Sequence, residues 1–108
     1  MTTVRLQLDY LQGAIWVSDI QTGEPMTGLA VIDRDEIIRE LNFEMADMYL
    51  SYYEFDCNAQ VFRFNKQKQK KDKKKMLMLL DNLKARLYEI NDGSFEIEDL
   101  ITPEYVNL

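Results

Sequence analysis

The chain has 108 residues, of which 46% are hydrophobic and 30% are charged, and its net charge is −6. This length and this balance are typical of one globular domain and argue against a disordered chain. No apolar stretch approaches the roughly 20 residues of a membrane helix, and the first residues lack the apolar run of a secretory signal. We therefore expect one domain over residues 1–108, located in the cytoplasm, with no membrane contact.

Apolar and polar residues alternate from Val4 to Tyr10, which predicts a first strand with one face in the core. Gln12-Gly13 can turn the chain, and the apolar residues of 14–18 predict the returning strand of a hairpin. A loop containing two glycines and a proline follows at 21–28. The short apolar run 29–32 predicts a third strand.

A helix is predicted over residues 34–53. Asp33 stands three residues before Glu36, which is an Asp variant of the capping box. Apolar residues then recur at about 3.6-residue spacing and form one face of the helix. The polar residues 56–58 break it, and the alternation in 60–65 predicts a fourth strand.

A second amphipathic helix is predicted from Met76 to Ile90, and Gly93 is placed to end it in a left-handed conformation. Residues 94–100 alternate and predict a last strand, with one helical turn after Pro103. The order is β-β-β-α-β-α-β. It predicts an α+β domain with an antiparallel or mixed sheet of four to five strands and two long helices on one face.

The composition argues against enzymatic chemistry. The chain has no histidine and one cysteine, so a Ser-His-Asp arrangement or a conventional zinc site cannot form within it. We interpret the acidic clusters 33–36 and 96–99 as a helix start and a solvent-facing strand. Cys57 follows Asp56, whose charge disfavours a reactive thiolate, so we expect it to be buried and inert. The sequence thus predicts no catalytic residues, no metal and no cofactor.

Charge is strongly polarised along the chain. Residues 66–75 hold seven lysines and one acid, a local charge of +6, which leaves −12 for the other 98 residues. Like charges one turn apart destabilise a helix, so we expect loop or frayed helix up to Asp72; alternatively, a helix starts at Asn65. The segment is a candidate site for nucleic acid or a phosphate ligand, and its lysines are Lys66, Lys68, Lys70, Lys71, Lys73, Lys74 and Lys75.

Both predicted helices carry more apolar surface than one stripe requires. Phe43 and Leu50 are seven residues apart and lie nearly opposite the main apolar face of the first helix. Leu77 and Tyr88 lie well off the apolar stripe of the second. Either the helices pack side by side, or a second molecule covers these residues. We predict that the four form an interface with a protein partner, most simply in a two-fold homodimer.

Aromatic residues cluster at 49–55, just before the predicted fourth strand. We interpret this cluster as the cap of a core at a helix end, met by Tyr10 and Trp16, with a binding pocket as the alternative. In the alternative nucleic-acid function, Phe62 and Phe64 would stack on bases beside the lysines. Together, these features predict a cytoplasmic, non-enzymatic module for protein interaction or assembly that self-associates. The alternative is a module that binds nucleic acid or a phosphate ligand.

Overall fold

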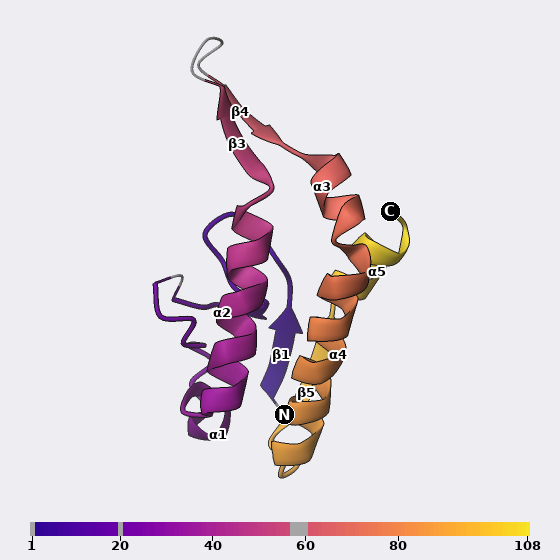
Figure 1. Cartoon of the computed structure of the whole chain (residues 1–108). Helices are drawn as coiled ribbons and strands as arrows, with labels where there is room; N and C mark the ends of the chain where they lie inside the picture. Colours follow the sequence, from indigo (N-terminus) through magenta and orange to yellow (C-terminus); the bar gives the residue numbers. More distant parts are fainter. Residues whose placement is uncertain (1, 20, 57–60) are drawn as a thin grey trace.

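The computed structural model describes residues 2–19, 21–56 and 61–108, and these have an α+β architecture (Figure 1). The strands are β1 (Thr2–Leu6), β2 (Ile15–Trp16), β3 (Tyr53–Asp56), β4 (Val61–Phe64) and β5 (Phe95–Asp99). The helices are α1 (Ala30–Asp33), α2 (Glu36–Leu50), α3 (Lys66–Lys71), α4 (Lys73–Ile90) and α5 (Ile101–Val106). The α+β class predicted from the sequence is confirmed.

Three strands form a mixed sheet in the order β2-β1-β5. Leu6 of β1 pairs antiparallel with Ile15, which confirms the predicted hairpin, whereas Val4 pairs in parallel with Ile97 of β5. The chain turns at Tyr10-Leu11 rather than at Gln12-Gly13, because an isolated bridge joins the flanking residues Asp9 and Gln12. The first and last strands of the chain therefore lie side by side.

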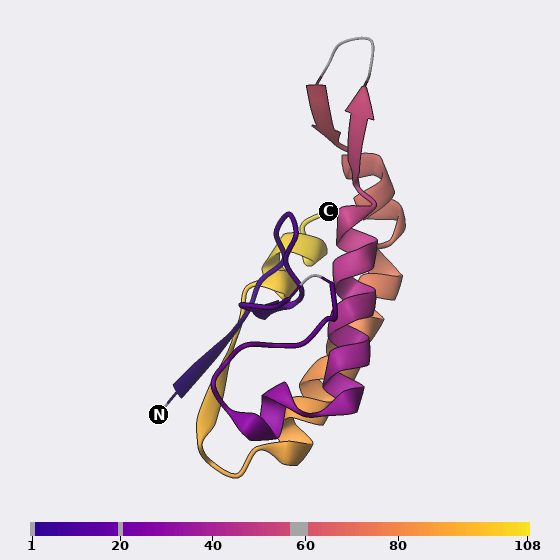
Figure 2. The ribbon, with the colours of Figure 1, turned by 90° about the vertical axis from the view of Figure 1, so that its left-hand side faces the viewer.

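Helices α2 and α4 lie side by side on one face of this sheet (Figure 2), as predicted. Their apolar stripes and the inner face of the sheet make one core. It includes Val4, Leu6, Ile15, Ile38, Met45, Met76, Leu80, Leu83, Leu87 and Phe95. On the other face of the sheet, Glu96 and Glu98 are exposed, as their alternation in the sequence indicates.

The predicted third strand at 29–32 is wrong, because this segment is the one-turn helix α1. The carboxylate of Asp33 accepts hydrogen bonds from the backbone N–H groups of Thr27 and Gly28 and from the Thr27 hydroxyl. These bonds fold the chain back before the turn. A run of four apolar residues fits a strand and a buried helical turn equally well, so periodicity could not distinguish them.

The first long helix is shorter than predicted, since α2 begins at Glu36 and ends at Leu50. Its N-cap is Asp35 rather than Asp33, and the Asp35 side chain accepts from Ile38 N at 2.9 Å. Arg86 of α4 also donates to Asp35 and holds the pKa of its carboxyl below the usual range. One carboxylate thus caps α2 and ties it to α4.

Strands β3 and β4 form a separate two-stranded sheet, which we call the ribbon, and it extends the long axis of the molecule to 51 Å (Figure 1). The predicted fourth strand is confirmed as β4, but the single sheet of four to five strands is wrong. β4 pairs with β3, at residues that the prediction assigned partly to the end of the helix. The backbone N–H of Asn65 donates to Tyr52 O at 2.7 Å and closes the base of the ribbon.

The lysine-rich segment is helical throughout, apart from a break at Asp72 between α3 and α4. This agrees with the alternative in which a helix starts at Asn65, whose side chain accepts from Lys68 N at 3.0 Å. Gly93 has a φ of +93° and β5 is present, as predicted, whereas α5 begins at Ile101, before Pro103 rather than after it. Of the described helices, none is long and apolar enough to cross a membrane.

A buried amide that the sequence pattern did not reveal organises the N-terminal loops. Asn42 of α2 is fully buried and accepts from Ile15 N at 2.9 Å. It also donates to Gly23 O at 2.8 Å and to the hydroxyl of Ser18. Because buried polar groups cost free energy unless they are hydrogen-bonded, these bonds hold Ile15, Ser18 and Gly23 against α2.

Candidate interaction surfaces

One face of the ribbon consists only of aromatic side chains. Tyr53 pairs with Phe64 across the two strands and Phe55 pairs with Phe62, and cross-strand partners share a face. The ring centroids lie 5.1 Å apart in the first pair and 5.3 Å apart in the second. We call Tyr53, Phe55, Phe62 and Phe64 the aromatic face. Phe55 is 54% exposed and Phe62 is 65% exposed, so the outer half of the aromatic face is open to water.

The inner half of the aromatic face is anchored in the body of the molecule. The rings of Tyr49 and Tyr52 contact Phe64 with centroids 5.6 and 5.7 Å away. The ring of Tyr10 lies 4.9 Å from that of Tyr53. The interpretation of 49–55 as a core cap holds for Tyr49 and Tyr52, and Tyr10 meets the cluster as expected. Trp16 forms no aromatic pair in the part of the chain that the structure describes.

A hollow of about 470 Å³ lies at the foot of the aromatic face, between the ribbon and α5. Its lining comprises Tyr49, Tyr53, Phe64, Lys66, Gln69, Glu104 and Leu108. Glu104 accepts from Gln69 Nε2 at 3.1 Å. Burial raises the pKa of Glu104, and the nearby charge of Asp9 raises it further. The hollow is thus lined by three aromatic side chains, one cation, Lys66, and one acid, Glu104, and Asp9 lies near that acid.

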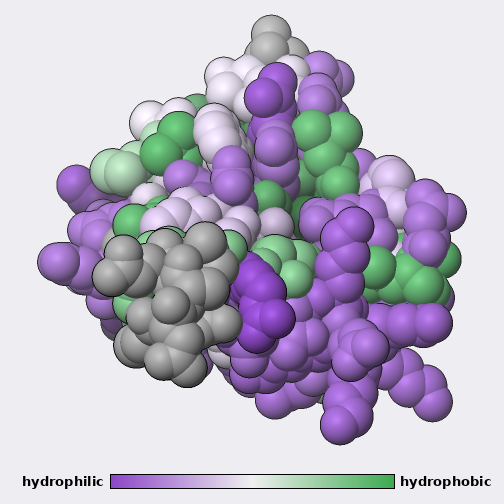
Figure 3. Space-filling model, turned by 90° about the horizontal axis from the view of Figure 1, so that it is seen from above, coloured by the Kyte–Doolittle hydropathy of each residue, from purple (hydrophilic) through white to green (hydrophobic). Residues whose placement is uncertain are grey.

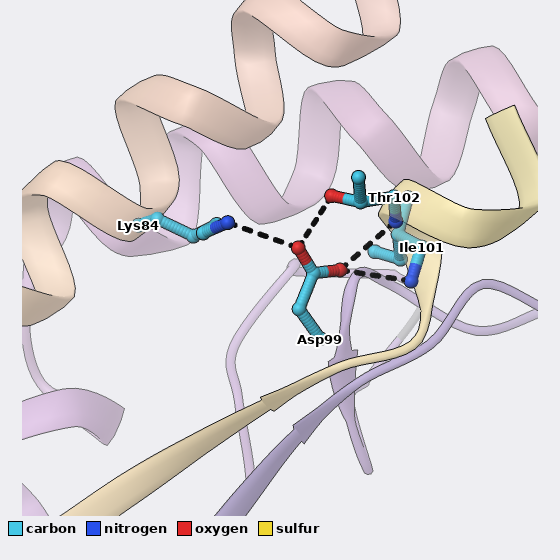
Figure 4. Close-up of polar contacts among 4 residues, drawn as sticks. All are labelled: Lys84, Asp99, Ile101 and Thr102. Atoms are coloured by element: carbon cyan, nitrogen blue, oxygen red, sulfur yellow. Dashed lines mark hydrogen bonds and ion pairs between the residues drawn. The ribbon is translucent and has the colours of Figure 1, made fainter. Parts of the chain in front are cut away.

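Asp99 fixes the start of α5 (Figure 4), the helix that contributes Glu104 to this hollow. Its carboxylate accepts from the backbone N–H groups of Ile101 and Thr102 at 2.9 and 3.0 Å, and from the Thr102 hydroxyl. Lys84 of α4 donates to the same carboxylate at 3.0 Å. Burial alone would raise the pKa of Asp99, but these bonds outweigh it and lower the pKa. The start of α5 is therefore joined to both β5 and α4.

Deeper in the same region, hydroxyl groups of two tyrosines meet inside the core. Tyr105 OH of α5 donates to Tyr52 OH at 3.3 Å, and both residues are fully buried. Burial raises the pKa of Tyr52 to about 12 and raises that of Tyr105 as well. Both hydroxyls therefore stay protonated at neutral pH and serve as hydrogen-bonding groups that join α5 to the base of the ribbon.

Two lysines of the basic segment are engaged with the ends of neighbouring helices. Lys68 Nζ donates to Ser51 O at 3.3 Å, at the end of α2. Lys73 Nζ donates to Val106 O at 3.4 Å, at the end of α5. Cations are stabilising at helix C-termini, where backbone carbonyl groups lack partners. In the described residues, no ion pair within 4.0 Å involves Lys66, Lys70, Lys71, Lys74 or Lys75.

The basic segment also lines two adjoining hollows on the side of the ribbon that carries Arg63. The first, of about 460 Å³, is lined by Asn65, Gln67, Lys68, Lys71 and Asp72. The second, of about 330 Å³, is lined by Glu54, Arg63, Phe64, Asn65, Lys66 and Gln67. Both hollows are lined by Asn65 and Gln67, so they form one continuous surface. Four cations lie along it: Arg63, Lys66, Lys68 and Lys71. We call this the basic track; it comprises Arg63, Asn65, Lys66, Gln67, Lys68 and Lys71.

The four residues predicted as a partner interface differ in their exposure. Phe43 is 44% exposed, and Gly23 packs so closely on its Cβ that a side chain at Gly23 would clash. Leu50, on the same helix, is half-buried. On α4, Leu77 packs against the core, whereas Tyr88 is 61% exposed. The side-by-side packing of the helices thus accommodates Leu77 and leaves Tyr88 in water.

The acidic cluster at 33–36 has structural partners. Asp33 closes the turn before α1 and Asp35 caps α2. In residues 2–19, 21–56 and 61–108, no three His, Cys, Asp or Glu side chains come together as metal ligands would. Cys57 lies outside the described residues.

Comparisons with family models, with curated proteins and with solved structures found no match for this chain.

The sequence interpretation did not identify the aromatic face. It noted Phe62 and Phe64 on one side of a strand but assigned Tyr53 to a helix. The signal was present, because Tyr53 and Phe55 alternate with Glu54 just before a short polar segment. Two alternating runs on either side of such a segment are typical of paired strands.

Proposed function

We propose that this chain is a small, non-enzymatic interaction module that associates with a second copy of itself through the aromatic face of the ribbon. The observation that supports it best is the exposure of Phe55 and Phe62 on a sheet of only two strands. A two-stranded sheet is marginally stable alone in water. Covering its aromatic face would remove this exposed apolar surface, and large exposed aromatic side chains commonly mark contact sites.

The mixed charge around the hollow favours a second copy over an unrelated partner. In a two-fold dimer the same patch meets itself, so a residue on one side of the axis contacts a residue that lies on the other side of the patch in the second copy. Lys66 of α3 and Glu104 of α5 both line the hollow, and the charge of Asp9 acts on Glu104. Such a patch is complementary to its own rotated copy, with the lysine of each protomer near the carboxylates of the other.

The size of the patch is consistent with a weak or moderate dimer. Aromatic side chains bury 150–250 Å² each, so the exposed parts of Tyr10, Phe55 and Phe62 amount to roughly 300 Å². A standard interface needs about 800 Å² from each partner. The aromatic rings would therefore form the centre of the contact and polar side chains its rim. Figure 3, which looks down on this end, shows apolar groups interspersed with hydrophilic ones.

Chemistry and composition support the other parts of the proposal. Without histidine, the chain lacks the commonest general base near neutral pH. A single cysteine allows no disulfide within the chain, which supports a reducing compartment such as the cytoplasm.

The proposal is tested by light scattering on purified protein over a range of concentrations. We expect the wild type to dimerise and the double variant Phe55→Ser/Phe62→Ser to remain monomeric. Met78→Ser is the matched control, because Met78 is 55% exposed on α4, away from the ribbon; it should dimerise like the wild type.

The same experiment compares the ribbon with the interface that the sequence predicts on the helices. The variant Phe43→Asp/Leu50→Lys changes the first two residues of the interface predicted from the sequence, and we expect it to dimerise. If this variant is monomeric while Phe55→Ser/Phe62→Ser is not, the interface lies on the helices. If the wild type is monomeric at every concentration, self-association is wrong.

A further inference from the structure

We propose that the basic track binds the phosphate groups of a single-stranded nucleic acid, as a second site that shares only Lys66 with the hollow beside the self-association surface. Its four cations are Arg63, Lys66, Lys68 and Lys71, and they line two adjoining hollows. This inference does not depend on the dimer, because Arg63 lies on the face of the ribbon opposite the aromatic face.

The arrangement of charge points to a polyanion. Lys66 and Lys70 stand four residues apart within α3, and such a like-charged pair destabilises a helix; the pairs 70/74 and 71/75 span the break at Asp72. Lys68 and Lys73 are engaged with helix ends, whereas none of the other five forms an ion pair in the described part of the chain. A bound chain of phosphates would neutralise the charges of the track.

The shape of the track favours a single strand. The two hollows follow each other along β4 and α3 and share Asn65 and Gln67, whose amide groups can bond phosphate or base. The ring of Phe64 packs against Tyr49, Tyr52 and Tyr53 on the aromatic face, so the track offers hydrogen-bonding amide groups to unpaired bases rather than a stacking surface. In a duplex the bases are already stacked, and its second row of phosphates would approach a body with a net charge of −12.

In Figure 3 hydrophilic side chains extend along the lower right, on the side where Figure 1 places α3 and α4.

Two carboxylates, Glu54 and Asp72, also line the hollows and limit the number of phosphates that fit. With three to four phosphates neutralised, affinity for a single strand should fall about 20- to 50-fold between about 50 and 200 mM salt.

The test is fluorescence anisotropy of a labelled oligothymidylate of about 12 nucleotides, a typical site size for such proteins. We expect the wild type to bind at low salt with this salt dependence. The variant Arg63→Gln/Lys71→Gln should lose about tenfold in affinity, and each removed cation should reduce the salt slope by about 0.7. Arg34→Gln/Arg39→Gln is the charge-matched control on exposed residues of the body, and it should bind like the wild type.

Three further outcomes would overturn the proposal: no binding by the wild type at low salt, an equal loss in the control variant, or equal binding of polyglutamate. Tighter binding of a duplex would overturn the single-strand assignment. The variant Phe55→Ser/Phe62→Ser is expected to retain most of its affinity. Its result separates the two proposals, because it removes the aromatic face and leaves the cations of the track unchanged.

Discussion

The rings of Tyr10 and Tyr53 lie 4.9 Å apart, although 43 positions separate the two residues in the chain. This contact joins the turn after β1 to the base of the ribbon. Tyr10 also approaches Phe62, with ring centroids 6.3 Å apart, so one side chain contacts both strands. Together with the Asn65 to Tyr52 backbone bond, it holds a projecting two-stranded sheet in a defined position.

Replacing Tyr10 by serine should therefore loosen the ribbon and leave the core intact. Aromatic pairs contribute about 0.5–1.5 kcal/mol each beyond the area they bury, and Tyr10 forms two. We expect faster amide hydrogen exchange at Phe62 and Arg63 and unchanged exchange at Leu83 in α4. Val17→Ser, a change at another exposed apolar residue, is the control. Equal acceleration in the ribbon and in α4 would contradict this account.

Replacing Asn42 by leucine tests the role of the buried amide. The change removes the acceptor for Ile15 N and the donor to Gly23 O in a fully buried site. Buried polar groups without partners cost about 1–3 kcal/mol, so the free energy of unfolding in urea should fall by at least about 2 kcal/mol. Asn82→Leu on the exposed side of α4 should change it by less than about 0.5 kcal/mol. A similar loss of unfolding free energy in both variants would show that the hydrogen bonds of Asn42 are not the cause.

Acid should destabilise the protein through Asp35 and Asp99. Hydrogen bonds from Arg86 lower the pKa of Asp35, and those from Thr102 and Lys84 lower the pKa of Asp99 despite its burial. Unfolded Asp has a pKa of about 3.9. Their stabilisation is thus present above about pH 4 and is lost as the pH falls through the lower folded values. Glu104, with a raised pKa, acts in the opposite direction.

The variant Asp35→Asn isolates one of these contributions, since asparagine still caps a helix. We expect it to be less stable than the wild type at neutral pH and equally stable once the pH is below the folded pKa of Asp35. Unfolding curves in urea across this pH range provide the comparison. A difference that does not change with pH would mean that the carboxylate charge is not involved.

Sequence reasoning worked where one period dominated a long segment. The stripe from Met76 to Leu87 predicted α4, and the alternation in 94–100 predicted β5. It failed at 29–32, where four apolar residues carry no period and a side-chain bond from Asp33 decides the conformation. It also failed at Tyr53, because an aromatic residue at helical spacing continues the pattern of α2 while its backbone pairs with β4.

The candidate sites depended on information that one-dimensional patterns do not contain. The positions of Phe43 and Leu50 on a helix wheel indicated surplus apolar surface, but not that Gly23 would cover part of it. The lysines were evident from the sequence. Only the fold shows that Lys68 of α3 reaches Ser51, that Lys73 of α4 reaches Val106 and that α3 lies beside Arg63.

The charges at the rim of the hollow give a test of the two-fold arrangement. Asp9→Lys or Lys66→Glu alone places like charges opposite each other across the axis. Exposed ion pairs contribute up to about 1 kcal/mol, so each change should weaken the dimer about two- to fivefold. The double variant restores opposite charges and should recover most of the affinity, as measured by sedimentation equilibrium. Additive weakening in the double variant would exclude this arrangement.

The most direct test of self-association through the aromatic face is a set of NMR spectra of the wild type from dilute solution to about 1 mM, a range that detects weak dimers. Dimerisation through this face should shift the ring signals of Phe55 and Phe62 with concentration, while the methyl signal of Met78 stays fixed. Ring signals that do not move, or shifts confined to Phe43 and Tyr88, would contradict the proposal.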